Sequence, residues 1–166
     1  MKVSIYSRAA MEELLSKGTL RGVAVISFHD PVGHGRRSGA GYAPIEFTGR
    51  CERVMKIAVH DLDPDALPDF GLSVESYFPE AMTLAAFIYE AVDEGLDIIC
   101  QCEYGQSRSA AAAAAILEHL ERRGIDIFAD YRYYPNQLVF NKLKAALEAE
   151  GTRREALMRE DMRGAR

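Results

Sequence analysis

The sequence predicts an α/β fold: a single domain in which a central, mainly parallel sheet of about four to five strands is flanked by helices. Short runs rich in β-branched residues alternate along the chain with segments whose apolar residues recur at helical spacing. One of these runs, Gly22 to Phe28, is apolar at nearly every position. Such a run is typical of a strand that is buried on both faces of a parallel sheet.

The first half of the chain contains three expected strands and one expected helix. Residues 2–6 alternate between polar and apolar side chains and predict a short strand. Ser7 is a favourable N-cap for the helix expected directly after it. The second strand is the apolar run at residues 22–28, and residues 53–59 form the third. Residues 31–50, between these two strands, hold five glycines and two prolines and predict a long loop.

The second half repeats the alternation. An acidic loop with two prolines, residues 61–69, leads into a helix that we expect from about residue 74 to residue 94. Residues 97–101 (DIICQ) predict a short apolar strand, and an alanine-rich helix is expected after the loop that follows. A final helix, capped by Asn136, is expected to reach about residue 150.

Composition restricts the class of protein. We expect one domain over residues 1–150 and a polar tail over residues 151–166 that is a frayed helix or a disordered end. The 166 residues are 48% apolar and 27% charged, which is ordinary for a globular protein. A formal net charge of -5 argues against a general affinity for nucleic acid or anionic membranes. Because there is neither a membrane-spanning apolar run nor a signal-peptide core, we expect a soluble, cytoplasmic protein.

The cysteines argue against two kinds of stabilisation. There are only three, Cys51, Cys100 and Cys102, and this odd number does not suit a disulfide framework. The chain has no Cys-x-x-Cys pair and few histidines, so a zinc site is not expected. We also expect no metal and no organic cofactor, because the loop at residues 102–109, described next, supplies the electrostatic stabilisation itself.

The segment that carries chemistry is residues 102–109 (CEYGQSRS), between the last expected strand and the alanine-rich helix. It lies at the carboxyl edge of the predicted sheet, where open α/β folds bind ligands. If the loop curls, its backbone N–H groups and the helix N-terminus point into one concavity that binds an anion. Arg108 adds a planar pair of donors for two phosphoryl oxygens, and Gly105 tolerates the dihedral angles of the curl. The expected phosphate-binding residues are Glu103, Tyr104, Gly105, Gln106, Ser107 and Arg108.

The same donors stabilise a thiolate, which is the nucleophilic form of cysteine. Cys102 is therefore the expected nucleophile for a bound phosphoryl group. The hydroxyl of Ser109 is expected to hydrogen-bond the sulfur and to ease its departure in a second step. Together with Arg108, these residues form the expected catalytic set of the loop.

The pattern Cys-x5-Arg-Ser, with glycine third after the cysteine, resembles the signature of the protein tyrosine phosphatase superfamily. The surroundings look most like its compact dual-specificity branch, especially small prokaryotic members. The strand DIIC, the helix SRSAAAAAA and the segments from Ser76 to Ile88 and from Tyr134 to Leu143 carry this resemblance. It implies hydrolysis of a phosphorylated protein or a small phosphomonoester through a phosphocysteine. Gln101 departs from the family, which usually has at this position a histidine that helps orient and activate the nucleophile.

The resemblance also implies a general acid, an aspartate on a loop roughly thirty to forty residues before the cysteine. Asp61 directly follows the expected strand and is favoured for this role, whereas Asp69 has the commoner spacing. The acid would protonate the leaving oxygen and then help to activate water, which Gln106 is a candidate to position. All the aspartates that qualify are Asp61, Asp63, Asp65 and Asp69.

Other hypotheses remain open from the sequence. The loop also suits a phosphate-recognising module with little or no catalysis, an arsenate reductase or a sulfurtransferase. Cys51 and Cys100 are the only available shuttling cysteines, and either is a candidate for a reversible disulfide with Cys102. Cys100 is more simply interpreted as a core strand residue. Basic residues of the long loop are candidates for holding an anionic substrate: His34, Arg36 and Arg37. The sequence decides neither the oligomeric state nor the substrate among phosphotyrosine, phosphoserine or phosphothreonine, phosphoinositides, inositol phosphates and nucleotides.

Overall fold

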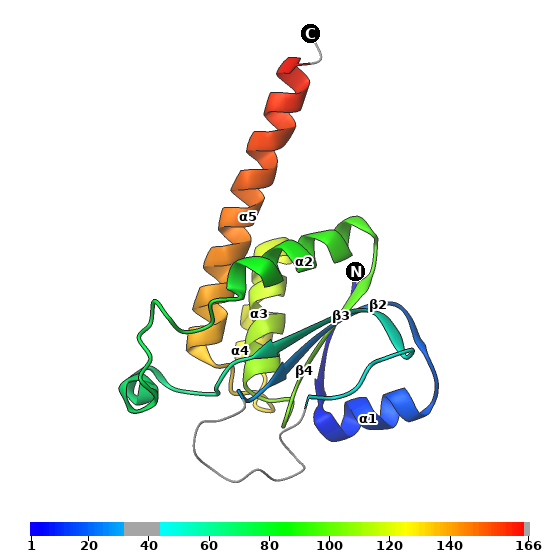
Figure 1. The fold of residues 1–166 in the computed structure, drawn as a ribbon, viewed down its shortest axis with the longest axis vertical. Helices are drawn as coiled ribbons and strands as arrows, with labels where there is room; N and C mark the ends of the chain where they lie inside the picture. Colours follow the sequence, from blue (N-terminus) through cyan, green and yellow to red (C-terminus); the bar gives the residue numbers. More distant parts are fainter. Residues whose placement is uncertain (32–43, 165–166) are drawn as a thin grey trace.

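A computed structural model describes residues 1–31 and 44–164 of the chain. Its sheet has four strands, β1 (Val3–Ser7), β2 (Leu20–His29), β3 (Cys51–Ala58) and β4 (Asp97–Cys102). Figure 1 shows how the sheet lies between the helices, with β2, β3 and β4 labelled. The strand order is β1-β4-β2-β3, and all three pairs are parallel. The predicted α/β class is confirmed, with a sheet at the lower end of the expected size.

Helices cover both faces of this sheet (Figure 1). Helix α1 packs on one face, where its residues Met11 and Leu15 join a core cluster with Val25 and Ile99. Helices α2 and α3 pack on the other face, over the larger core cluster, and α5 packs against both of them. The helical segments are α1 (Arg8–Ser16), the 3-10 helix η1 (Pro64–Phe70), α2 (Ala81–Asp93), α3 (Arg108–Glu121), α4 (Ile125–Phe128) and α5 (Gln137–Gly164).

The side chains of β4 alternate between these two faces, as those of any strand do. Cys100 and Cys102 belong to the cluster beneath α3, whereas Ile99 belongs to the α1 side. Gln101 is directly opposite Ser27 of β2 in the ladder and is buried. The strand therefore fixes the directions of the side chains of its last residues, up to the point where the following loop begins.

Two expected helix boundaries are wrong. Helix α2 begins at Ala81 and not near residue 74. The reason is local: Phe78 has a φ of 56°, and Pro79 after it disfavours a helical conformation in the residue that precedes it. Both Tyr77 and Phe78 are buried, so this turn places two aromatic rings in the core before the helix begins.

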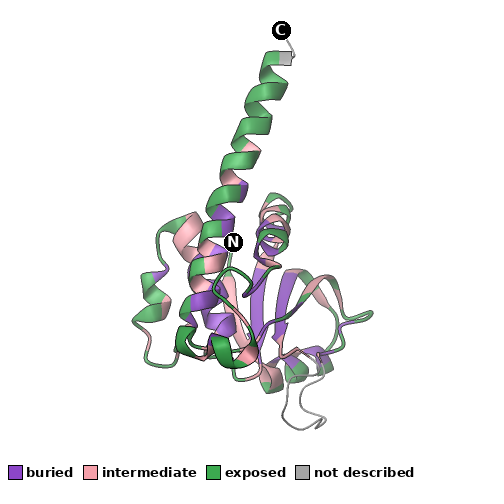
Figure 2. Ribbon diagram, turned by 60° about the vertical axis from the view of Figure 1, so that its left-hand side comes forward, coloured by how far each residue is buried: buried purple, intermediate pink, exposed green. Residues whose placement is uncertain are grey.

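Helix α5 does not end near residue 150, because it continues through Gly151 to Gly164. A Cβ at Gly151 would lie 2.5 Å from the hydroxyl oxygen of Tyr89, so this glycine is a close packing contact and not a helix stop. Arg154 on the next turn pairs with Asp93 and stacks over the Tyr89 ring. Figure 2 shows the far part of α5 extending from the body of the molecule with an exposed surface.

The long loop expected at residues 31–50 is described only in part. His34, Arg36 and Arg37 lie outside the described residues, so their expected role stays a prediction. In the part after residue 43, Ile45 and Phe47 are buried against α1 and have no regular secondary structure. Within the described residues, no helix combines the length and the apolar character needed to cross a bilayer.

Candidate active site

The loop after β4 curls tightly, and Gly105 makes this curl possible. Its φ is 69°, in the left-handed region that favours glycine. A Cβ there would lie 2.6 Å from the backbone nitrogen of Ser7 and 2.9 Å from the carbonyl carbon of Tyr6. The loop therefore packs directly on the junction between β1 and α1, and a side chain at residue 105 has no room.

The backbone carbonyls of the loop are held by neighbouring elements. The N–H of Arg8 donates to the carbonyl of Glu103 (3.1 Å), and the Arg8 guanidinium pairs with the Glu103 carboxylate (2.7 Å). On the other side, the N–H of Tyr134 donates to the carbonyl of Gln106 (2.9 Å). Within the described part of the chain, no N–H group of residues 103–107 donates a hydrogen bond. These N–H groups are thus available to an anion, as expected for a backbone anion nest.

Cys102 ends β4 and is only 2% exposed. Its Sγ lies 3.0 Å from the Oγ of Ser109, in the first turn of α3. The Gln101 side chain hydrogen-bonds other groups than the sulfur: its Nε2 donates to the carbonyl of Cys102 (2.8 Å), and its Oε1 accepts from Ser27 (2.6 Å). Gln101 therefore fixes the backbone of the cysteine.

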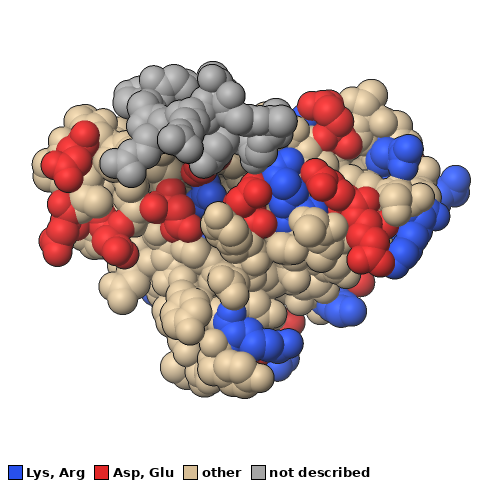
Figure 3. All heavy atoms as spheres, turned by 90° about the horizontal axis from the view of Figure 1, so that it is seen from below, with Lys and Arg blue, Asp and Glu red and all other residues tan. Residues whose placement is uncertain are grey.

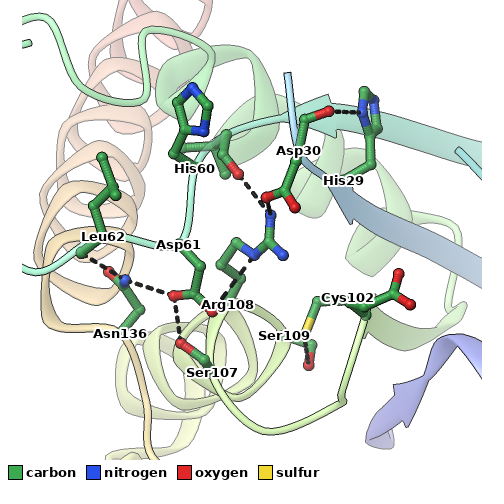
Figure 4. Close-up of polar contacts among 12 residues, drawn as sticks. His29, Asp30, His60, Asp61, Leu62, Cys102, Ser107, Arg108, Ser109 and Asn136 are labelled. Atoms are coloured by element: carbon green, nitrogen blue, oxygen red, sulfur yellow. Dashed lines mark hydrogen bonds and ion pairs between the residues drawn. The ribbon is translucent and has the colours of Figure 1, made fainter. Parts of the chain in front are cut away.

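Arg108 begins α3, and its side chain turns inward and is buried. Its Nη1 donates to the carbonyl of Val59 and to Oδ1 of Asp30, each at 2.7 Å. Its Nε is buried and has no hydrogen-bond partner among the described residues, since Oδ2 of Asp61 lies 3.8 Å from it, too far for a hydrogen bond. Figure 4 shows the two carboxylates approaching the guanidinium from different sides.

Asp61 is tied to the loop by polar side chains. Its Oδ1 accepts from the Oγ of Ser107 (2.6 Å) and from Nδ2 of Asn136 (2.9 Å). Asn136 also caps α5, as the sequence predicts, because its Oδ1 accepts from the N–H of Val139 (3.0 Å).

A buried tyrosine holds the backbone next to Asp61. The hydroxyl of Tyr77 donates a hydrogen bond to the carbonyl of His60 at 2.7 Å. Burial raises the pKa of this hydroxyl, and the charge of Asp61 raises it further.

The other candidate acids lie on the segment that contains η1, and their side chains are exposed. No hydrogen bond or ion pair links their carboxylates to residues 102–109 within the described chain. These residues are Asp63, Asp65 and Asp69. Of the four candidate aspartates, Asp61 is the one whose carboxylate contacts the loop within the described residues.

Sequence reasoning missed Asp30. The residue directly follows β2, just as Asp61 comes shortly after β3, so both stand at the carboxyl edge of a parallel sheet. That position could have revealed it, since polar residues at this edge converge on one site. It was overlooked because it lies between the strand predicted over residues 22–28 and the long loop predicted over residues 31–50, and was assigned to neither.

The remaining cysteines are free thiols. Cys100 is completely buried, and burial together with the neighbouring Cys102 raises the pKa of its thiol. Cys51 is partly exposed, and burial raises the pKa of its thiol too. Within residues 1–31 and 44–164, no three His, Cys, Asp or Glu side chains form a group that could hold a metal ion.

Figure 3 views the molecule from the side at which the loop lies, with acidic side chains in several groups and basic ones among them. With a net charge of -5, the protein as a whole does not attract anions. An anion site here depends on local donors, namely the loop N–H groups and Arg108.

No family sequence model matches the chain, and no curated protein sequence matches it. Solved structures do match. Tk-PTP in its active form aligns with a TM-score of 0.52 at 17% identity, over 89% of this chain and 92% of its own. PTPMT1 in complex with PI(5)P aligns with a TM-score of 0.51 at 12% identity, over 92% of this chain and 94% of its own. The chain has the protein tyrosine phosphatase fold.

A third match to this phosphatase fold is the human tyrosine phosphatase-like serine/threonine/tyrosine-interacting protein, with a TM-score of 0.50 at 17% identity. It aligns over 88% of this chain and 85% of its own. At such low identity the likeness establishes the fold alone. The chemistry of residues 102–109 is therefore argued from the contacts described above.

Proposed function

We propose that this chain is a cysteine-dependent phosphomonoester hydrolase that acts through a phosphocysteine intermediate. One observation carries the proposal: Arg108 is buried, yet its Nε has no hydrogen-bond partner among the described residues. A buried donor without an acceptor costs free energy. A phosphoryl group would supply acceptors for Nε and for Nη2 beside it, while the N–H groups of residues 103–107 would bind its remaining oxygens.

In the first step, the thiolate of Cys102 attacks phosphorus. An S–P bond forms and the ester P–O bond breaks. Asp61 gives its proton to the leaving oxygen, so that an alcohol or phenol departs. Arg108 and the loop N–H groups stabilise the charge on the equatorial oxygens, as donors aimed at a transferring phosphoryl group do.

In the second step, water attacks the phosphorus of the phosphocysteine, and the S–P bond breaks. The Asp61 carboxylate takes a proton from this water, and inorganic phosphate is released. The sulfur leaves as a thiolate, and the hydroxyl of Ser109 at 3.0 Å would donate a hydrogen bond to it. Gln106 is exposed on the loop and stays a candidate to position the water.

The substrate class that we propose is a phosphorylated protein or a small phosphomonoester. Because PTPMT1 has been solved with PI(5)P, a phosphoinositide belongs in a substrate panel beside phosphopeptides, inositol phosphates and nucleotides. A free thiolate nucleophile works in a reducing compartment, so the proposed location is the cytoplasm.

The test is hydrolysis of p-nitrophenyl phosphate in the presence of a metal chelator by the wild-type protein and by Cys102→Ser. We expect activity in the wild type and none above background in the variant, with trapping of a phosphorylated Cys102 after rapid quenching. Cys51→Ser serves as the matched control, because it removes a free thiol outside the loop and should leave turnover unchanged.

Two other results would favour different functions. Retained affinity for phosphopeptides without hydrolysis by the wild type would indicate a phosphate-recognising module. Thiol-dependent arsenate reduction, or transfer of sulfur from thiosulfate to cyanide, with no phosphatase activity, would indicate one of the other enzymes that use a similar loop.

A further inference from the structure

Glu103 puts a carboxylate into the loop that is proposed to bind an anion, and neither the sequence pattern nor the proposed mechanism gives this charge a role. The residue directly follows Cys102, and its side chain is 34% exposed. A negative side chain so close repels both a phosphoryl dianion and the thiolate of the cysteine. A loop of this sequence therefore needs a compensating cation if it is to bind phosphate well.

The cation is supplied by Arg8, the first residue of α1. Its Nε lies 2.7 Å from Oε2 of Glu103, and the Arg8 side chain is 17% exposed, so the ion pair is partly removed from water. Nη1 of the same guanidinium lies 3.3 Å from Oε1 of Glu12, one turn along α1. The closer of the two contacts ties the first residue of the anion nest to a helix that begins 95 residues earlier.

The backbone of Arg8 holds the same loop residue. Its N–H donates to the carbonyl of Glu103 at 3.1 Å and continues the parallel ladder in which Ser7 is opposite Cys102. In a trans peptide, a carbonyl and the N–H of the following residue point in opposite directions. Because the Glu103 carbonyl points toward α1, the N–H of Tyr104 points away from it.

The strand order shows where the Tyr104 N–H is directed. Strand β1 lies on one side of β4, whereas β2 and β3 lie on the other side. The guanidinium of Arg108 is held by Asp30 after β2 and by the carbonyl of Val59 after β3, so it lies on this second side (Figure 4). The N–H of Tyr104 therefore points toward the side on which Nε of Arg108 is available, and the two donors converge on one anion.

We propose that Arg8 is a positioning residue of the anion site with two functions. Its N–H fixes the peptide between Glu103 and Tyr104 so that the Tyr104 N–H faces the bound phosphoryl group. Its guanidinium neutralises the Glu103 carboxylate so that the loop does not repel this group. The inference rests on the proposed hydrolase function and names a residue beyond its catalytic set, since it makes the start of α1 a part of the anion site.

Two substitutions at residue 8 separate the two functions. Arg8→Ala removes the guanidinium and keeps the N–H, whereas Arg8→Pro removes both. Proline suits the first position of a helix, and Ser7 before it has the extended conformation that precedes proline, with a φ of -76° and a ψ of 168°. Each substitution is made in Cys102→Ser, so that the measured affinity does not depend on turnover. Tungstate, a tetrahedral oxyanion like phosphate, is then titrated by calorimetry.

The two losses of affinity should differ in size and in salt dependence. Arg8→Ala should weaken tungstate binding about fivefold at low salt, because the Glu103 carboxylate is then unpaired beside the anion. This loss should nearly vanish at about 1 M salt, where charges are screened over about 3 Å. Arg8→Pro should weaken binding by a further factor of about five to ten, because the Tyr104 N–H loses its fixed direction. That further loss should persist at high salt, since it does not arise from an unpaired charge.

Removal of the carboxylate tests the neutralising function directly. Glu103→Gln added to Arg8→Ala should restore the affinity for tungstate to within about twofold of the Cys102→Ser parent, because no charge then needs a partner. An ion pair that served only the structure would give the opposite result, since the contact stays broken in the double variant. Absence of recovery would thus overturn the neutralising function, and equal affinities of Arg8→Pro and Arg8→Ala would overturn the fixing of the peptide.

Arg53→Ala is the matched control, because it makes the same change in net charge at another arginine ion pair. Arg53 pairs with Glu90 and Glu94 at the amino end of β3, whereas the loop lies beyond the carboxyl ends of the strands. Its replacement should leave the affinity for tungstate unchanged. A loss equal to that of Arg8→Ala would mean that net charge alone sets the affinity, and it would contradict the neutralising function. If Arg8→Pro fails to fold, Arg8→Ala with an ester in place of the residue 8 peptide N–H gives the same comparison.

The titrations and the phosphatase assay fail independently. A wild type without phosphatase activity would contradict the proposed hydrolase, yet the titrations would still decide whether Arg8 shapes the anion site. An active wild type whose Arg8→Ala and Arg8→Pro variants bind tungstate as tightly as the parent would instead remove the inference and leave the hydrolase intact.

Discussion

The candidate phosphate-binding loop and the segment that carries the candidate acids are held in very different ways. Residues 102–109 are fixed by glycine packing, by backbone hydrogen bonds from two other elements and by a buried arginine. In residues 61–70, polar side chains connect Asp61 to the loop, and the backbone then continues into the exposed η1 helix. The difference teaches that the shape of the candidate anion site is determined by main-chain packing, whereas the orientation of the proposed proton donor depends on a few side-chain contacts.

The largest effect is expected from Gly105→Ala. The new Cβ would meet the backbone of Tyr6 and Ser7 in addition to the strain of a positive φ, so the loop must move. We expect hydrolysis and tungstate binding to be lost and the free energy of unfolding to fall by about 2–4 kcal/mol, measured by urea denaturation.

Gly95→Ala separates strain from packing in that experiment. Gly95 has a φ of 70°, nearly that of Gly105, but a Cβ there has nothing within 4 Å. It should cost about 1 kcal/mol and leave activity intact. Similar losses of activity in the two variants would show that packing on β1 does not determine the loop.

A large but purely catalytic effect is expected from Asp61→Asn. Removing the acid should lower kcat for a substrate with a poor leaving group by about 10²–10³-fold, while tungstate affinity stays near that of the wild type. Steady-state assays with phenyl phosphate measure this change in kcat. The acid assignment would be wrong if Asp69→Asn, Asp63→Asn or Asp65→Asn produced that loss and Asp61→Asn did not.

A smaller effect is expected from Asn136→Ala, which removes both the α5 cap and one hydrogen bond to Asp61. Loss of the cap should destabilise the protein by about 1 kcal/mol, and kcat should fall about tenfold with little change in anion affinity. Asn141→Ala, at an exposed position on the same helix, is the control. A fall in anion affinity as large as the fall in kcat would indicate that Asn136 supports the whole loop.

The smallest effect at neutral pH is expected at Cys100, which belongs to the core and not to the loop. Burial raises the pKa of its thiol, so the folded protein keeps the proton while the unfolded chain loses it above about pH 9. The unfolded state then binds fewer protons, and stability falls as pH rises by up to about 1.4 kcal/mol per pH unit. Urea denaturation between pH 8 and pH 10 should show a shallower fall in Cys100→Ala than in the wild type. An unchanged slope would contradict the assignment.

The order of elements could be predicted from the sequence because apolar runs and caps are local signals. Ser7 caps α1 through a hydrogen bond from the N–H of Ala10, and the run that contains Val25 and Ile26 is a strand buried on both faces. The start of α2 could not be predicted, since the turn at Phe78 follows from burial of aromatic rings against distant strands. The length of α5 could not be predicted, because a glycine is typical of a helix end, whereas Gly151 lies inside the helix and allows a close approach to the Tyr89 hydroxyl.

The part of the candidate site that lies in one contiguous segment of the chain could be predicted from the sequence. Residues 102–109 carry their geometry within a single loop, so spacing alone indicated an anion nest. The partners contributed by other segments, Asp30, Val59 and Tyr77, are brought in by the sheet and by a buried turn. For Gln101 the sequence indicated a missing histidine, but only the strand ladder reveals Ser27 as its partner.

Asn136 belongs at once to the first turn of the longest helix and to the environment of Asp61. Fraying of that turn would release the Asn136 amide from the Asp61 carboxylate, so local opening of α5 and reorientation of the proposed proton donor would be one event. In native-state hydrogen exchange, the exchange rate of the Val139 amide would then report how often Asp61 is released from Asn136. Any partner that bound and rigidified the start of α5 would raise the fraction of molecules ready to protonate a leaving group, without touching the anion nest.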